Sequence, residues 1–88
     1  MTKLTAIITD DERHSREALL QKLQKNCPEV EILALCASAQ EGIEAIKNYS
    51  PDVLFLDIEM PMVNGFEMLK MLDQITPQII FTTAYNEF

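Results

Sequence analysis

The 88-residue chain lacks the residue patterns that mark several functional classes. Its two cysteines, Cys27 and Cys36, do not form a CxxC pair, so neither a disulfide framework nor a zinc motif is predicted. It has only two glycines and no glycine-rich phosphate loop, which argues against nucleotide binding. No apolar stretch approaches transmembrane length, and the N-terminus does not resemble a signal peptide. We therefore expect a cytoplasmic protein with reduced thiols.

Positive charge is also scarce in this sequence. Seven lysines and arginines stand against fourteen aspartates and glutamates, which gives a net charge of −7. Nucleic acid and an anionic membrane are therefore not expected as direct partners of these residues, whereas a divalent cation or a basic protein surface would suit this charge. Apolar residues make up 48% of the chain, which predicts one small globular domain over residues 1–88.

Apolar runs alternate with helical patterns along the chain. The run before Asp57 is typical of a strand buried on both faces of a parallel sheet, and the charged start of the second run predicts an edge strand. Three βα units followed by a strand indicate a doubly wound α/β fold, although this pattern does not give the strand order. The strands are predicted over residues 4–9, 30–37, 52–56 and 79–82, and the third helix over residues 66–73.

The same pattern predicts how each helix begins and which face it buries. Asp10 or Asp11 is expected to cap the first helix, and Ser38 and Glu41 are expected to form a capping box at the start of the second. The residues predicted to face the core are Ile43, Ile46 and Tyr49 in the second helix and Phe66, Leu69 and Leu72 in the third.

Carboxylates follow two of the predicted strands. Asp10 and Asp11 come after the first strand, and Asp57 ends the third. Because α/β sheets place their ligand sites at the carboxyl ends of the strands, these three side chains are expected to converge. The carboxylates of such a cluster repel one another and need a bound cation. Mg²⁺, or alternatively Mn²⁺, would suit this role because it prefers oxygen ligands. Each motif alone is weak, since paired aspartates after a strand often only cap a helix.

A hydroxyl after the fourth strand, from Thr82 or Thr83, completes a pattern suited to phosphoryl transfer. One carboxylate can attack phosphorus, the others can hold a metal ion that neutralises charge, and the hydroxyl can bind a phosphoryl oxygen.

These residues together resemble the receiver domain of two-component response regulators. The matching pieces are Asp10-Asp11, Asp57, Met60-Pro61, Gly65 and Thr83-Ala84. The resemblance covers the whole chain and implies a flavodoxin-like (CheY-like) fold, with the strand order 2-1-3-4 for the strands present. The end of the chain further resembles receivers that precede LytTR-type DNA-binding domains, which implies a transcription regulator with such a domain in a longer protein.

The resemblance also implies a role for each matching residue. Asp57 would be the phosphoacceptor, which takes a phosphoryl group from a sensor histidine kinase. Asp11 and Asp57 would bind Mg²⁺ directly together with the main-chain carbonyl of Glu59, while Asp10 would act through a metal-bound water. Thr83 would bind the phosphoryl group as the switch residue, and the Glu59 side chain would tune dephosphorylation. The protein would then be a signalling phosphoacceptor and not an enzyme.

The sequence departs from the family pattern at its C-terminal end. Receivers have a fifth strand with an aromatic switch residue and a following lysine that pairs with the phosphoryl group, but here the last lysine is Lys70, in the predicted third helix. We therefore expect residues 1–88 to be a receiver truncated before its fifth strand. The segment 79–81 would then form an open apolar edge through which two chains could pair as a homodimer.

Two other functional classes stay open. Phosphatases and hydrolases with an aspartyl nucleophile commonly carry a second Asp two residues later, where this chain has Glu59, and the Asp10-Asp11 pair has no place in that pattern. A non-phosphorylated interaction fragment would retain the acidic cluster without using it. Phosphotransfer from a small donor would separate a receiver from such a fragment, and turnover of phosphate esters would favour a hydrolase.

Overall fold

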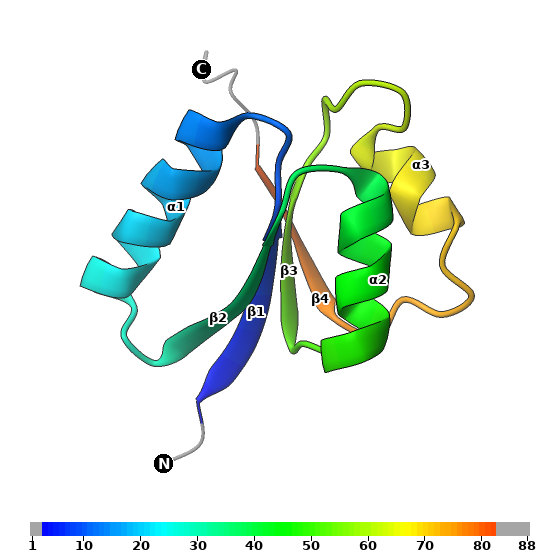
Figure 1. The fold of residues 1–88 in the computed structure, drawn as a ribbon. Helices are drawn as coiled ribbons and strands as arrows, with labels where there is room; N and C mark the ends of the chain where they lie inside the picture. Colours follow the sequence, from blue (N-terminus) through cyan, green and yellow to red (C-terminus); the bar gives the residue numbers. More distant parts are fainter. Residues whose placement is uncertain (1–2, 83–88) are drawn as a thin grey trace.

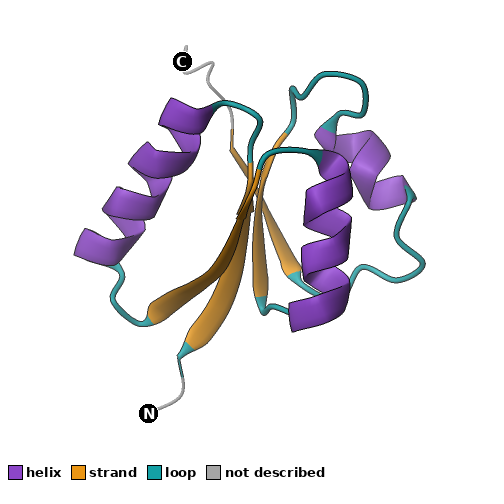
Figure 2. Ribbon diagram, in the orientation of Figure 1, coloured by secondary structure: helices purple, strands orange, loops and turns teal. Residues whose placement is uncertain are grey.

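The computed structural model describes residues 3–82, in which helices cover both faces of a parallel sheet (Figures 1 and 2). Helix α1 lies on one face, and α2 and α3 lie on the other. Strands and helices alternate as predicted. The elements are β1 (Leu4–Thr9), α1 (Arg13–Asn26), β2 (Val30–Cys36), α2 (Ala39–Tyr49), β3 (Val53–Asp57), α3 (Gly65–Lys70) and β4 (Gln78–Thr82).

The strand order is β2-β1-β3-β4, which confirms the order implied by the resemblance. All neighbouring strands are parallel, and β1 and β3 occupy the centre of the sheet. Their central position explains why both are almost wholly apolar. The second strand lies at an edge, as its charged start predicted, and its register with β1 shifts so that Leu33 is an extra residue. Such a bulge discourages pairing at an edge.

Hydrophobic clusters lie on each face of the sheet because neighbouring strand residues point to opposite faces. In β1, Ala6 and Ile8 pack with Phe55 and Leu23 under α1, while Ile7 packs on the other face under α2 and α3. Each fully buried aliphatic side chain contributes about 1.5–3 kcal/mol relative to exposure. Both faces of the central strands are therefore covered. None of the described helices has the length and apolar character needed to cross a bilayer.

The helix caps differ in part from the predicted ones. Helix α1 is capped by Glu12, whose carboxylate accepts from the N–H of His14, and not by Asp10 or Asp11. The Asp10 carboxylate instead accepts from the Glu12 N–H at 2.8 Å. This bond keeps the Asp10 side chain at the end of the strand, before the helix begins.

At α2 the predicted capping box is only half formed. The Ser38 hydroxyl accepts from the Glu41 N–H at 3.2 Å, but the Glu41 carboxylate accepts from Ala37 at 2.8 Å. A complete box that was not predicted from the sequence joins Asn64 and Glu67 at the start of α3.

The predicted buried face of α3 is wrong at Phe66, which is 51% exposed, whereas Met68 is fully buried. The helix begins at Gly65 and ends at Lys70. Its buried face contains Gly65 and Met68, so Met68 is the large side chain directed at the sheet. Phe66 instead packs at the rim against Phe81 of β4, with ring centroids 5.1 Å apart. Tyr49 is also exposed, contrary to prediction. Ile43, Ile46 and Leu69 pack against the core as predicted. Leu72 does so too, but the predicted helix over residues 66–73 is too long, because α3 ends at Lys70 and Leu72 lies beyond it.

Candidate functional site

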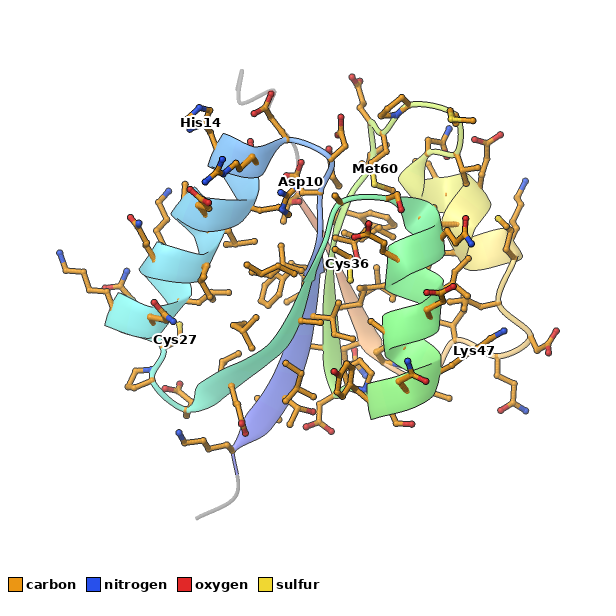
Figure 3. The ribbon with its side chains drawn as sticks, viewed as in Figure 1. Asp10, His14, Cys27, Cys36, Lys47 and Met60 are labelled. Carbon is orange, nitrogen blue, oxygen red and sulfur yellow. The ribbon has the colours of Figure 1, made fainter. Side chains whose placement is uncertain are left out.

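Three aspartates converge at the carboxyl ends of the two central strands. Asp57 is the last residue of β3, and Asp10 follows β1, in which Thr9 pairs in register with Leu56. Each of Asp10, Asp11 and Asp57 offers a carboxylate oxygen, and these oxygens lie within 4.8 Å of one another. Figure 3 shows Asp10 at the same end of the sheet as Met60. The convergence predicted from the sequence is therefore present.

The loop after β1 holds Asp10 through three of its polar atoms. Its N–H donates to the Cys36 carbonyl at 3.0 Å, which extends the ladder between β1 and β2. Its carboxylate accepts from the Glu12 N–H, and its carbonyl accepts from Nη1 of Arg16 at 2.8 Å. Asp10 is buried, while the neighbouring Asp11 is exposed. Asp11 thus forms the accessible side of the acidic cluster.

The loop after β3 is closed by tight local contacts. The Asp57 carboxylate accepts from the Glu59 N–H at 3.2 Å, and the Gly65 N–H donates to the Ile58 carbonyl at 2.8 Å. A Cβ on Gly65 would lie 2.6 Å from the Asp57 carbonyl oxygen, so only glycine fits this approach. Met60 is buried in the core below the loop. The buried Met60 and the close approach at Gly65 therefore hold the loop that carries Glu59.

Burial and mutual repulsion shape the electrostatics of the cluster. Burial, followed by the charge of Asp10, raises the pKa of Asp57 from 3.8 to about 6, although the Glu59 N–H acts in the opposite direction. The pKa of Asp10 is also raised, chiefly by burial, and this shift is reduced by the Glu12 N–H and the charge of Arg16. Three ionised carboxylates here oppose one another, so a bound cation would stabilise them.

The donor set fits a divalent cation of the Mg²⁺ type. Mg²⁺ binds hard oxygen ligands, needs only one or two carboxylates and retains several waters. Asp57 and Asp10 are buried and Asp11 is exposed, an arrangement that leaves one side of the cluster open to water or an anionic ligand. The acidic cluster therefore has the composition and spacing required for such an ion.

Two further residues were predicted to belong to the site, Glu59 and Thr83, and the structure describes only the first. The Glu59 side chain is exposed, while its main chain adjoins Asp57. Thr83 lies outside the described residues. Its neighbour Thr82 ends β4 and pairs in register with Asp57.

The contact of Arg16 with the acidic loop was not predicted. From the sequence, Arg13 is the basic residue nearest to the three aspartates, but in the fold its side chain pairs with Glu17, and Arg16 is the one that bonds the acidic loop.

A flavodoxin-like sheet with an acidic cluster after its first and third strands defines a class of phosphoryl-transfer and signalling proteins. The response regulator receiver domain model matches residues 6–88, and the chain belongs to that family. It is a receiver-domain sequence of two-component signal transduction, as the resemblance implied.

Relatives and solved structures agree with this assignment. The chain is 42% identical over 86 residues to an uncharacterized response regulatory protein of Vibrio cholerae and 45% identical over 86 residues to the transcriptional regulatory protein BtsR of Escherichia coli. Both matches cover 97% of this chain but 36% of the relative. The chain therefore spans about a third of the length of these curated relatives.

Among solved structures, the N-terminal domain of an uncharacterized Wolinella succinogenes protein is similar with a TM-score of 0.76 and 30% identity, covering 96% of this chain and 67% of that chain. The receiver domain of the putative response regulator NarL from Mycobacterium tuberculosis gives a TM-score of 0.83 at 22% identity, covering 99% and 71%. The second match supports the fold alone.

Proposed function

We propose that Asp57 is the phosphoacceptor of this receiver and takes a phosphoryl group from a phosphohistidine of a sensor kinase. The observation that carries this proposal is the convergence of Asp10 and Asp11 on the buried carboxylate that ends β3. A carboxylate oxygen of Asp57 attacks phosphorus, the phosphorus–nitrogen bond breaks, and the imidazole leaves with a proton. The product is an acyl phosphate on Asp57.

The surrounding residues would hold Mg²⁺ and direct this transfer. Asp11 and Asp57 would bind the ion directly with the Glu59 carbonyl, and Asp10 would bind through a water. The ion supplies positive charge that offsets the developing charge of the phosphoryl oxygens. Thr83 would bind the phosphoryl group as the switch residue, and the exposed Glu59 side chain would tune its hydrolysis. The chain itself would act as a signalling phosphoacceptor and not as an enzyme.

Phosphorylation by a small donor tests the assignment. Incubation with acetyl phosphate and Mg²⁺ should add one phosphoryl group, detected by intact mass and lost on treatment with base or hydroxylamine. Asp57→Asn should abolish the addition, whereas Asp73→Asn, an exposed carboxylate in the connection after α3, should leave it unchanged. An equal yield from Asp57→Asn would refute the proposal, and continuous release of phosphate from simple phosphate esters would favour a hydrolase.

We also propose finer features of the whole protein. The kinase partner, a cytoplasmic location and a C-terminal LytTR-type DNA-binding domain in a longer protein follow from the resemblance. We propose that residues 1–88 form the receiver part of that protein, up to the fourth strand. Expression of the complete gene product and DNA binding with and without phosphorylation would test these features.

A homodimer through the edge of β4 is a separate proposal. Within residues 3–82, β4 pairs only with β3, and Ile80 and Phe81 are 46% and 42% exposed. Unlike β2, it has no bulge in its register. An apolar, regular edge favours pairing with another strand. Sedimentation velocity should show a fraction of dimer that increases with protein concentration. A monomer at every concentration would contradict this proposal.

A further inference from the structure

Arg16 contacts the acidic loop from a position one turn into α1. Its side chain is only partly exposed, and its Nη1 donates to the main-chain carbonyl of Asp10 at 2.8 Å. A hydrogen bond from a charged guanidinium is stronger than one between neutral groups. This bond ties the helix to the loop that carries Asp10 and Asp11.

The bonded carbonyl belongs to the peptide unit that joins Asp10 to Asp11. Because a peptide unit is planar, fixing its oxygen restricts the rotation of the chain on both sides of the plane. Asp10 has further anchors in the Cys36 carbonyl and the Glu12 N–H. Among the described residues, no comparable side-chain hydrogen bond holds the Asp11 carboxylate. The direction of Asp11 therefore depends on the two peptide planes that flank it, and Arg16 holds the first of them, while the Glu12 N–H anchors the second to the Asp10 carboxylate.

We propose that Arg16 is a positioning residue for the divalent-cation site, which holds the Asp10–Asp11 peptide so that the Asp11 carboxylate faces Asp57. This inference rests on the proposed function, because it assumes that Asp11 is a direct ligand. Residues that orient metal ligands from outside the coordination sphere commonly have a strong effect on metal affinity. The role of Arg16 is therefore measurable by metal binding, without any phosphotransfer.

Charge and positioning predict opposite effects when Arg16 is replaced. A positive charge beside the cluster repels a cation, so its loss alone should tighten metal binding. Loss of the bond to the Asp10 carbonyl should weaken it, since part of the binding free energy would then be spent on ordering the loop. The sign of the change in affinity therefore separates the two effects.

Arg13 provides a matched control on the same helix. It carries the same charge and lies closer in sequence to Asp11, but its Nε pairs with Glu17 at 3.0 Å on the exposed surface. Arg13→Gln therefore removes one positive charge near the loop and leaves the bond to Asp10 intact. Exposed pairs of this kind contribute little to stability.

The experiment measures Mn²⁺ binding to the wild-type chain and its variants from the electron paramagnetic resonance signal of the free ion. We expect Arg16→Gln to raise the Kd about tenfold. Arg16→Lys should weaken binding at least as much, because it retains the repelling charge on a side chain too short for the same bond. Arg13→Gln should alter the Kd by less than about twofold, towards tighter binding.

Urea unfolding in EDTA separates positioning from a general role in stability. A purely structural contribution of Arg16 would lower the unfolding free energy and leave the Kd of the folded chain unchanged, which would overturn the inference. Equal Kd values for Arg16→Lys and the wild type would also overturn it, as would tighter binding by Arg16→Gln or loss of folding in Arg16→Lys. If the wild-type chain bound no Mn²⁺, the metal site assumed by the proposed function would be refuted. If the wild-type chain binds Mn²⁺ and the Arg16 variants bind it with the same Kd, only the role of Arg16 is refuted.

Discussion

Replacing Gly65 with alanine should damage both the stability of the domain and its acidic site. An added Cβ would lie 2.6 Å from the Asp57 carbonyl oxygen and 3.1 Å from the Ile58 Cα. The first distance is about 0.8 Å shorter than the 3.4 Å at which ordinary contact begins. Both obstructing atoms belong to the main chain, so no side-chain rotation can relieve the contact. The loop itself must move.

The expected cost follows from two opposing effects. Alanine favours a helix over glycine by about 1 kcal/mol, although this gain is smaller at the first position of α3 than within a helix. Overpacking against a structure that cannot adjust typically costs about 1–3 kcal/mol. We therefore expect a net loss of about 1–2 kcal/mol. Movement of the Asp57 carbonyl should also shift its carboxylate and slow phosphorylation by acetyl phosphate by about tenfold, as a small misplacement at a reacting group does.

Urea unfolding in EDTA and intact-mass kinetics measure the two effects, and Gly42→Ala is the control. At Gly42 the added Cβ would lie 2.8 Å from Met68 Cε and from Thr9 Oγ1, which are side-chain atoms within the core. This variant should lower stability by a similar or smaller amount and keep the phosphorylation rate of the folded chain near that of the wild type. A Gly65→Ala chain with unchanged stability and rate would refute the reasoning.

Two further predictions follow from burial at the site and in the core. Because the pKa of Asp57 is raised from 3.8 to about 6 in the folded state, the metal-free domain should lose stability as pH rises from about 4 to 6, by at most about 3 kcal/mol. Asp57→Asn should flatten this pH dependence of urea unfolding, and Mg²⁺ affinity should increase through the same range; a steeper dependence in Asp57→Asn would contradict the assignment. Met68→Ala should lower the unfolding free energy by about 2–5 kcal/mol and Phe66→Ala by about 1 kcal/mol, because Met68 is fully buried whereas Phe66 is half exposed. Equal losses would show that the register of α3 is wrong.

Much of the fold follows directly from local sequence patterns. The apolar run before Asp57 predicts a central strand, since a strand covered on both faces must be apolar throughout, and β3 is central. The paired Asp10-Asp11 and the single Asp57 were placed at strand ends by the same reasoning. Parallel strands end at one edge, so the cluster follows once β1 and β3 are neighbours. The neighbourhood itself came from the family resemblance, because periodicity carries no strand order.

Packing choices between similar residues were poorly predicted. Phe66 and Met68 are both apolar in the same short helix, and only the start of α3 at Gly65 decides which one faces the sheet. The caps show the same limit. Asp11 and Glu12 are both able to accept from a helix N–H, and the choice of Glu12 depends on Asp10 being held at the strand end.

The sequence by itself determined the succession of strands and helices and the three carboxylates, because hydrophobic period and residue chemistry are local properties. Only the tertiary structure decided the raised pKa of Asp57, since burial and the nearby charge of Asp10 arise when two strands distant in sequence lie side by side. It likewise decided that Arg16, and not Arg13, bonds the acidic loop. Both are facts of distance in space, which no local pattern along the chain encodes.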